Sequence, residues 1–170
     1  MLEIFLFIFF AVIAVASAVI MITRANPVIS AIFLIINFFA LAGLYLILNA
    51  QFIAVLQILV YAGAIMVLFV FVIMLLNLGD EEALTDKFNL KRITAISVGG
   101  VIFLQLAYII LVKGNSVINI PQSNNSVEAG KVESIGMKLF TTYLIPFEIT
   151  SMLLIAAIIG AVVLAKRNFE

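Results

Sequence analysis

Long apolar stretches follow one another along the chain, separated by shorter polar segments. The hydrocarbon core of a bilayer is about 30 Å thick, and a helix of about 20 apolar residues crosses it. Helices in soluble cores are usually shorter and keep a polar face. The pattern therefore predicts an all-α integral membrane protein with a single membrane domain over 1–170. Its five transmembrane helices are expected at 2–22, 28–48, 51–76, 93–112 and 147–165, with a polar loop at 113–146.

Composition agrees with this prediction and removes several classes of function. Hydrophobic residues make up 66% of the chain, against about 45–50% in soluble domains, and mean hydropathy is +1.34. There is no cysteine and no histidine, which excludes cysteine-ligated iron–sulfur clusters, haem with axial histidine and histidine acid–base catalysis. The formal net charge is zero and no basic patch indicates nucleic acid. We expect no cofactor and no metal on this chain.

The third stretch, 51–76, is the most unusual one. Its 26 residues contain no charge and no proline and would run for roughly 39 Å as an α-helix. That length exceeds the hydrocarbon core, so the helix either tilts or contains a local defect. Directly after Tyr61, the residues Ala62, Gly63 and Ala64 form a small-residue notch. A glycine inside a helix costs about 1 kcal/mol relative to alanine, which makes this notch the weak point of the helix.

One face of this third helix is predicted to be small and polar. In a regular α-helix, a spacing of four and three residues places Ala50, Ala54, Gln57, Tyr61 and Ala64 in one stripe. Such a stripe inside a membrane usually faces other protein. Only Asn49 and Ala50 separate the second and third helices, so we expect an antiparallel hairpin in direct contact.

Two prolines are expected to open helices. Pro27 suits the first position of the second helix, where its missing N–H is no loss. Pro146 is expected to open the last helix, with Glu148 in the first turn, where the helix dipole favours a carboxylate. Before it, apolar residues at helical spacing within 132–143 predict a short helix lying at the membrane interface.

The distribution of Lys and Arg between the loops predicts how the chain is oriented across the membrane. With five spans, the loops at 23–27 and 77–92 lie on the same side as the C-terminal tail. Cytoplasmic loops carry an excess of positive charge. We therefore expect the N-terminus outside and the C-terminus in the cytoplasm. The cytoplasmic side then holds Arg24, Lys87, Lys91, Arg92, Lys166 and Arg167, and the other side holds Lys113, Lys131 and Lys138.

The polar side chains deep within the predicted spans are all uncharged. No Asp, Glu, Lys or Arg lies deep inside any of them, whereas a self-contained proton pump needs ionisable groups there. A tyrosine hydroxyl both donates and accepts, so Tyr61 could hold water or face a carboxylate of a partner. It could equally fill a helix contact and bond a backbone carbonyl. The same two interpretations stay open for Asn37, Gln57, Gln105 and Tyr108.

Three segments resemble a known family. They are LVYAGAIMVLFVFVIMLLNLG (59–79), the hairpin 26–57, and LFTTYLIPFEITSMLLIAAIIGAVVLAKR (139–167). All three are similar to the J-type membrane subunit of proton-pumping NADH:quinone oxidoreductase, respiratory complex I, whose mitochondrial-encoded counterpart is subunit 6. The loop 113–138 has no such match.

The resemblance implies a non-catalytic subunit of a proton-translocating enzyme. FMN, the iron–sulfur clusters and quinone would be carried by partner subunits, with none on this chain. The partners would be the A-, K-, H- and N-type membrane subunits, in a hetero-oligomer in the bacterial inner (cytoplasmic) membrane. The ionisable groups absent from this chain would then come from its neighbours.

The resemblance also implies a gate in the third helix. In the family, this helix switches between a regular α-helix and one with a π-bulge, which opens and closes a water path between quinone reduction and proton movement. The bulge maps to 61–64, with Tyr61 near the path and Gly63 as the flexible glycine. Rotation beyond the bulge would move Met66, Leu68 and Phe69. Glu148 matches the PFE of the family, with no role beyond the helix start.

Three other functions are weighed against this one. A related dehydrogenase with another electron donor would contain a very similar subunit. A solute transporter acting alone predicts an internal repeat with matched broken helices, and the sequence shows none. A structural membrane scaffold predicts that changes in the notch affect assembly only.

Overall fold

The computed structural model describes residues 1–76, 90–113, 128 and 130–166, and every regular element among them is helical. Within these residues, four helices are long and apolar enough to cross a membrane. They match four of the five expected spans, and their bounds are Leu2–Thr23, Pro27–Ile47, Gln51–Leu75 and Leu144–Ala165.

The first two helices, α1 (Leu2–Thr23) and α2 (Pro27–Ile47), form a hairpin. Pro27 is the first residue of α2, as expected, and the Asn26 side chain caps the helix. The Asn26 Oδ1 atom accepts hydrogen bonds from the backbone N–H groups of Val28 (3.0 Å) and Ile29 (3.2 Å). These two bonds satisfy N–H groups that have no partner within the helix, which fixes where α2 begins.

Helix α1 packs against α2 through small residues and through the side-chain amide of Asn37. The Asn37 Nδ2 atom donates to the backbone carbonyl of Ala14 (2.7 Å) and to the hydroxyl of Ser17 (3.3 Å). Further along the pair, a Cβ at Gly43 would stand 2.6 Å from the Phe10 ring, so only glycine lets the ring lie against α2. The open question about Asn37 is answered here, because its amide joins two helices.

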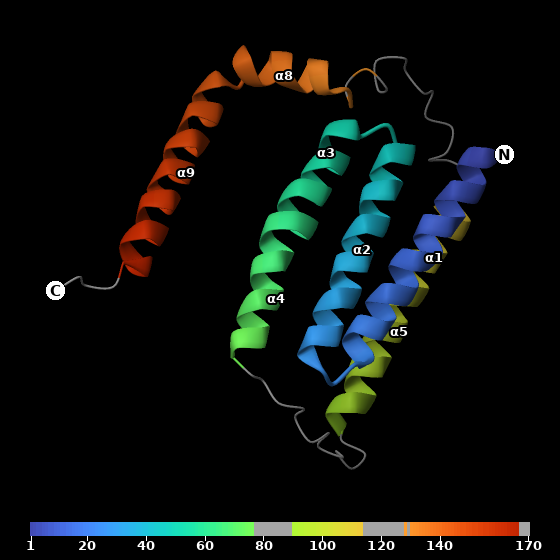
Figure 1. Cartoon of the computed structure of the whole chain (residues 1–170). Coiled ribbons are helices and arrows are strands. Elements are labelled where there is room, and N and C mark those ends of the chain that lie inside the picture. Colours follow the sequence, from blue (N-terminus) through green and yellow to red (C-terminus); the bar gives the residue numbers. More distant parts are fainter. Residues whose placement is uncertain (77–89, 114–127, 129, 167–170) are drawn as a thin grey trace.

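The third span consists of three consecutive helical segments, together called helix three. They are α3 (Gln51–Leu56), the π-helix η1 (Gln57–Ile65) and α4 (Met66–Leu75). A short turn leads into it, in which Asn49 has a positive φ of 59° and the Ala50 N–H donates to the Tyr45 carbonyl (2.9 Å). Helix three then runs back along α2 and contacts it through all three segments, so the expected antiparallel hairpin is confirmed (Figure 1).

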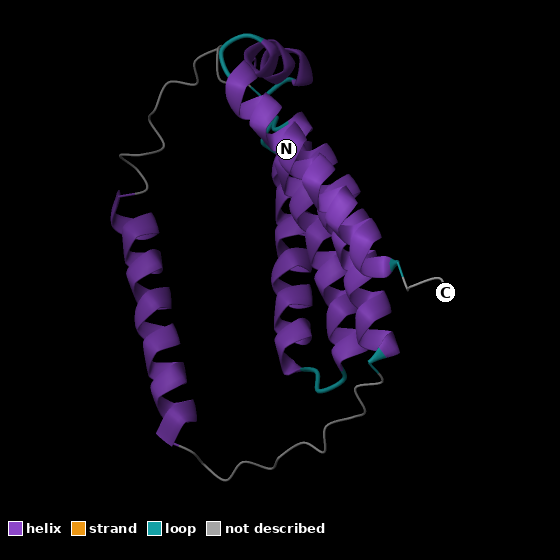
Figure 2. Cartoon of the chain, turned by 90° about the vertical axis from the view of Figure 1, so that its left-hand side faces the viewer, coloured by secondary structure: helices purple, strands orange, loops and turns teal. Residues whose placement is uncertain are grey.

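The expected fourth span, 93–112, lies in α5 (Leu90–Tyr108) and η2 (Ile109–Lys113). The apolar part with described side chains, Ser97–Val112, is shorter than the four spans above, so five spans are not confirmed. Among the described residues α5 packs on η2 alone. Figure 2 shows this helix standing apart from the others.

The C-terminal part contains α8 (Val132–Phe140), followed by α9 (Leu144–Ala165). The short helix predicted within 132–143 is therefore present, and it crosses the end of the helical array where the N-terminus lies (Figure 1). A T-shaped contact between the rings of Phe140 and Phe147, with centroids 5.0 Å apart, holds α8 to α9.

Helix α9 begins earlier than expected. Pro146 is its third residue, not its first, which is tolerated because the first four N–H groups of a helix have no internal partner. Glu148 consequently lies beyond the first turn, so its carboxylate is farther from the free N–H groups than the sequence indicated. Part of the predicted 113–146 loop is also helical, whereas 114–127 and 129 lie outside the described residues.

The packed part of the molecule is the unit of α1, α2 and helix three. Its buried core is formed by Ala31, Met66 and Ile73. In contrast, α9 contacts only α8 among the described elements, and its apolar side chains are exposed. In a membrane such surfaces meet lipid or other protein.

Candidate functional site

The site built from the sequence lies in the π-helix η1, nine residues from Gln57 to Ile65. The π-helix contains all four residues, 61–64, at which the resemblance places a bulge. It is longer than a single bulge. A π-helix bonds each carbonyl to the N–H five residues on, is rare, and is frequent at functional sites.

The π-helix changes which residues face α2. The buried residues of helix three are Ala54, Gln57, Ala62, Met66 and Ile73, each 8% exposed or less. From Gln57 to Ala62 the step is five residues, whereas a regular α-helix would step four and bury position 61. Adding one residue to a turn rotates all that follows by about 100°.

The predicted small and polar stripe is therefore divided. Its first part is correct, because Ala54 and Gln57 are buried against neighbouring helices. Its second part is wrong within this chain, because Tyr61 is 48% exposed and Ala64 is exposed. The reason is physical: the stripe assumed a continuous α-helix, and η1 moves the buried positions from 61 and 65 to 62 and 66.

Tyr61 is held by an aromatic ring of α2. The Phe38 and Tyr61 rings meet edge to face, with centroids 5.8 Å apart and planes at 66°. The hydroxyl group of Tyr61 has no hydrogen bond to any described residue. The backbone carbonyl bond expected for a plain packing role is thus absent from the described part of the chain.

The contact between Phe38 and Tyr61 was not predicted from the sequence, although the distance of each residue from the turn indicates it. Phe38 lies eleven residues before Asn49 (49 − 38), and Tyr61 lies eleven residues after Ala50 (61 − 50). In an antiparallel hairpin, positions equally far from the turn lie opposite each other, so the pair could have been inferred from the turn.

The remaining predicted gate residues fall into two groups. Ala62 and Met66 are buried, and Met66 packs with residues of α2 in the core of the three-helix unit. Leu68 and Phe69 are 63% and 48% exposed. The structure therefore places part of the set against α2 and part on the open surface.

Gly63 has a steric reason to be glycine. A Cβ at this position would stand 3.1 Å from the backbone oxygen of Ile58, five residues earlier. That carbonyl comes close because η1 widens the helical turn. A side chain at 63 therefore requires a small local shift of this carbonyl or of the backbone.

Glu148 is not brought to this site. It is exposed on α9, and α9 has no contact with helix three among the described residues. Its backbone carbonyl accepts a hydrogen bond from the Ser151 hydroxyl (2.7 Å). Gln105 and Tyr108, on α5, are likewise exposed and far from any described contact with η1.

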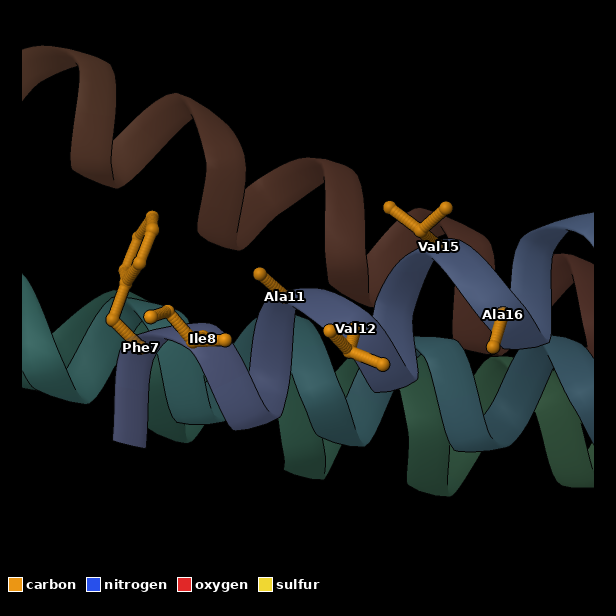
Figure 3. Close-up of a pocket in the computed structure, with 6 residues that line it drawn as sticks. All are labelled: Phe7, Ile8, Ala11, Val12, Val15 and Ala16. Atoms are coloured by element: carbon orange, nitrogen blue, oxygen red, sulfur yellow. The ribbon is translucent and has the colours of Figure 1, made fainter. Parts of the chain in front are cut away.

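Two features of the described residues bear on the binding of metals and ligands. No group of three or more His, Cys, Asp or Glu residues that could hold a metal is found among them. A hollow of about 420 Å³ lies on the outer side of α1 and has no polar lining (Figure 3). Its walls are Phe7, Ile8, Ala11, Val12, Val15 and Ala16, which offer no group for catalysis.

These features define a helical multi-pass membrane protein whose third span is interrupted by a π-helix. Comparison with known proteins gives the family. The profile described as NADH-ubiquinone/plastoquinone oxidoreductase chain 6 matches residues 17–164, and the chain belongs to this family.

Individual relatives agree along nearly the whole chain. Subunit J of NADH-quinone oxidoreductase from Buchnera aphidicola is 37% identical over 164 residues, covering 95% of this chain and 98% of that protein. The Escherichia coli (strain K12) subunit J is 36% identical over 157 residues (92% and 83%). NADH-ubiquinone oxidoreductase chain 6 of Marchantia polymorpha is 37% identical over 177 residues (96% and 86%).

Proposed function

We propose that this chain is a non-catalytic membrane-arm subunit of a proton-translocating NADH:quinone oxidoreductase, and that helix three acts as a gate between quinone reduction and proton movement. The observation that carries the proposal is the five-residue step from Gln57 to Ala62 in the buried face. It gives helix three two alternative pairings with α2, which differ by one residue. A bistable packed element of this kind is what a switch requires.

The two pairings can be written residue by residue. In the π register, which the structure has, Ala62, Met66 and Ile73 face α2. In the α register, a continuous α-helix, positions 61, 65 and 72 take their places. In the switch, Tyr61 would take the buried place of Ala62 and Met66 would turn outward. Phe69 would move from the surface into the place of Val70 beside the core, whereas Leu68 would stay exposed. Exchanging apolar for polar groups along one surface wets or dries a path beside it.

The chemistry of electron transfer belongs to other subunits in this proposal. FMN, the iron–sulfur clusters and quinone are assigned to partners, and this chain has no Cys to ligate an iron–sulfur cluster. The A-, K-, H- and N-type subunits would cover the exposed α5 and α9. The chain would lie in the bacterial inner membrane with its N-terminus outside and its C-terminus in the cytoplasm.

Two alternatives make different predictions. A related dehydrogenase with another electron donor would use the same gate, since donor chemistry lies elsewhere; the donor accepted by the purified complex distinguishes it. A structural scaffold would use η1 for packing alone. The Tyr61 hydroxyl has no hydrogen bond in the described part of the chain, which favours the gate, because a plain packing role would pair it with a backbone carbonyl.

The test compares Gly63→Val with Gly99→Val in membranes that contain the whole enzyme. A Cβ at Gly99 meets nothing within 4 Å in this chain, so this variant controls for adding a β-branched side chain to a spanning helix. Complex abundance, electron transfer and proton uptake are read on one sample. A gate predicts normal abundance with reduced coupled activity for Gly63→Val only. Abundance falling in step with activity would favour the scaffold.

A further inference from the structure

Gln57, where η1 begins, is a largely buried residue whose amide has no hydrogen bond among the described residues. It is 8% exposed, on the face of helix three that packs within the three-helix unit. Neither its amide nitrogen nor its amide oxygen has a hydrogen bond to any described residue. Buried polar groups in proteins nearly always have such a partner, so this amide needs one from outside the described chain.

The position is also open enough to receive that partner. Among the described residues, no side-chain nitrogen or oxygen is fully enclosed without a hydrogen bond. The amide of Gln57 is therefore accessible at the surface of the unit, although the residue as a whole is more than nine-tenths buried.

A second unpartnered polar group lies one helical turn away. Tyr61 follows Gln57 by four residues, and it is half-exposed beside the buried face that Gln57 and Ala62 share. A buried water needs two to four polar partners. The Gln57 amide supplies one donor group and one acceptor, and the hydroxyl of Tyr61 is the next polar side-chain group along helix three.

We infer that the amide of Gln57 binds a water molecule at the start of η1, and that this water is the fixed polar contact from which the gate is hydrated. The role given to this water rests on the proposed function, whereas the binding of the water does not. Gln57 precedes the shift of register, so it stays on the buried face in both registers. Tyr61, by contrast, moves. The bound water would therefore remain while the hydroxyl beside it approaches or withdraws.

Cysteine labelling tests whether water reaches position 57, and it is selective because the chain contains no cysteine. Gln57→Cys and Ile73→Cys are made separately in the whole enzyme and treated with a small methanethiosulfonate reagent. Labelling is measured by the mass of this chain. Gln57 and Ile73 are both 8% exposed and on the same face, so burial is matched. Since only a hydrated thiol forms the reactive thiolate, we expect labelling at position 57 to be about tenfold faster or more.

A second experiment tests whether the water takes part in proton movement. Gln57→Leu removes the amide at similar size, and Gln105→Leu makes the same change on exposed α5. We expect Gln57→Leu to lower proton uptake per electron transferred, with Gln105→Leu unchanged. Gln57→Glu, which keeps a polar group at the site, should retain more coupling than Gln57→Leu.

Two results would overturn the inference. Equal labelling at positions 57 and 73 would mean that no water reaches the amide, or that a partner side chain covers it. Rapid labelling with normal coupling in Gln57→Leu would mean that the water has no part in the gate. Failure of the proposed function itself is separate, because it appears as unchanged coupling in Gly63→Val whatever the labelling at position 57.

Discussion

Truncating two adjacent residues of helix three should shift the balance between its π and α registers in opposite directions. Met66 is 3% exposed and packs in the core in the π register, whereas Ile65 is 48% exposed there. In the α register their roles exchange. Met66→Ala should therefore weaken the π register, and Ile65→Ala should weaken the α register.

The size of the effect follows from packing. Truncating a buried methionine to alanine costs about 2–5 kcal/mol in soluble cores. In a membrane the lipid is as apolar as the core, so the transfer part is lost and the packing part remains. We expect about 1–2 kcal/mol for Met66→Ala, which shifts the ratio of the two registers by roughly five- to thirtyfold.

Paired cysteines report the register. Val28 of α2 packs against the core that contains Ile73, and Val72 beside it is 42% exposed. A short bifunctional thiol reagent should join Val28→Cys to Ile73→Cys in the π register and Val28→Cys to Val72→Cys in the α register. No other cysteine of this chain competes with these pairs. Met66→Ala should raise the relative yield of the second pair, and Ile65→Ala should lower it.

The reasoning would be refuted if both truncations moved the yields in the same direction. Equal shifts would mean that positions 65 and 66 contribute to general packing and that no second register exists.

Three further predictions follow from single contacts. Asn37→Leu removes the amide that joins α1 to α2 and should lower the stability of this chain in the complex by about 1 kcal/mol, measured by thermal release from the purified enzyme. Gly43→Ala should lower complex abundance because its Cβ would meet the ring of Phe10; adding Phe10→Ala should restore part of that loss, and no restoration would contradict the contact. Tyr61→Phe keeps the ring contact and loses the hydroxyl, so abundance should stay normal while proton uptake per electron falls at least twofold, with Tyr45→Phe as control.

Much of the fold could be predicted from the sequence because membrane helices are governed by simple requirements. Four apolar stretches became spans, since backbone groups in lipid must bond within a helix. Pro27 and the two-residue turn at Asn49 fixed the second helix and the hairpin. Helix ends were less certain. Pro146 was taken as a start, whereas a helix tolerates proline anywhere in its first turn.

The face of helix three could not be predicted for a different reason. Periodicity assumes one kind of helix, and η1 changes the spacing of buried positions at Gln57. Small residues at 62–64 indicated a weak point without indicating how the chain would use it. The unpartnered amide of Gln57 was equally hidden, since a sequence does not show which polar groups lack partners.

The most direct test of the gate is the register of helix three in the working enzyme. The two cysteine pairs, Val28 with Ile73 and Val28 with Val72, are cross-linked in membranes at rest and during steady turnover with NADH and quinone. The account predicts that the Ile73 pair dominates at rest and that the Val72 pair rises during turnover. Yields that are the same in both conditions, with the Val72 pair at background, would contradict a switching gate.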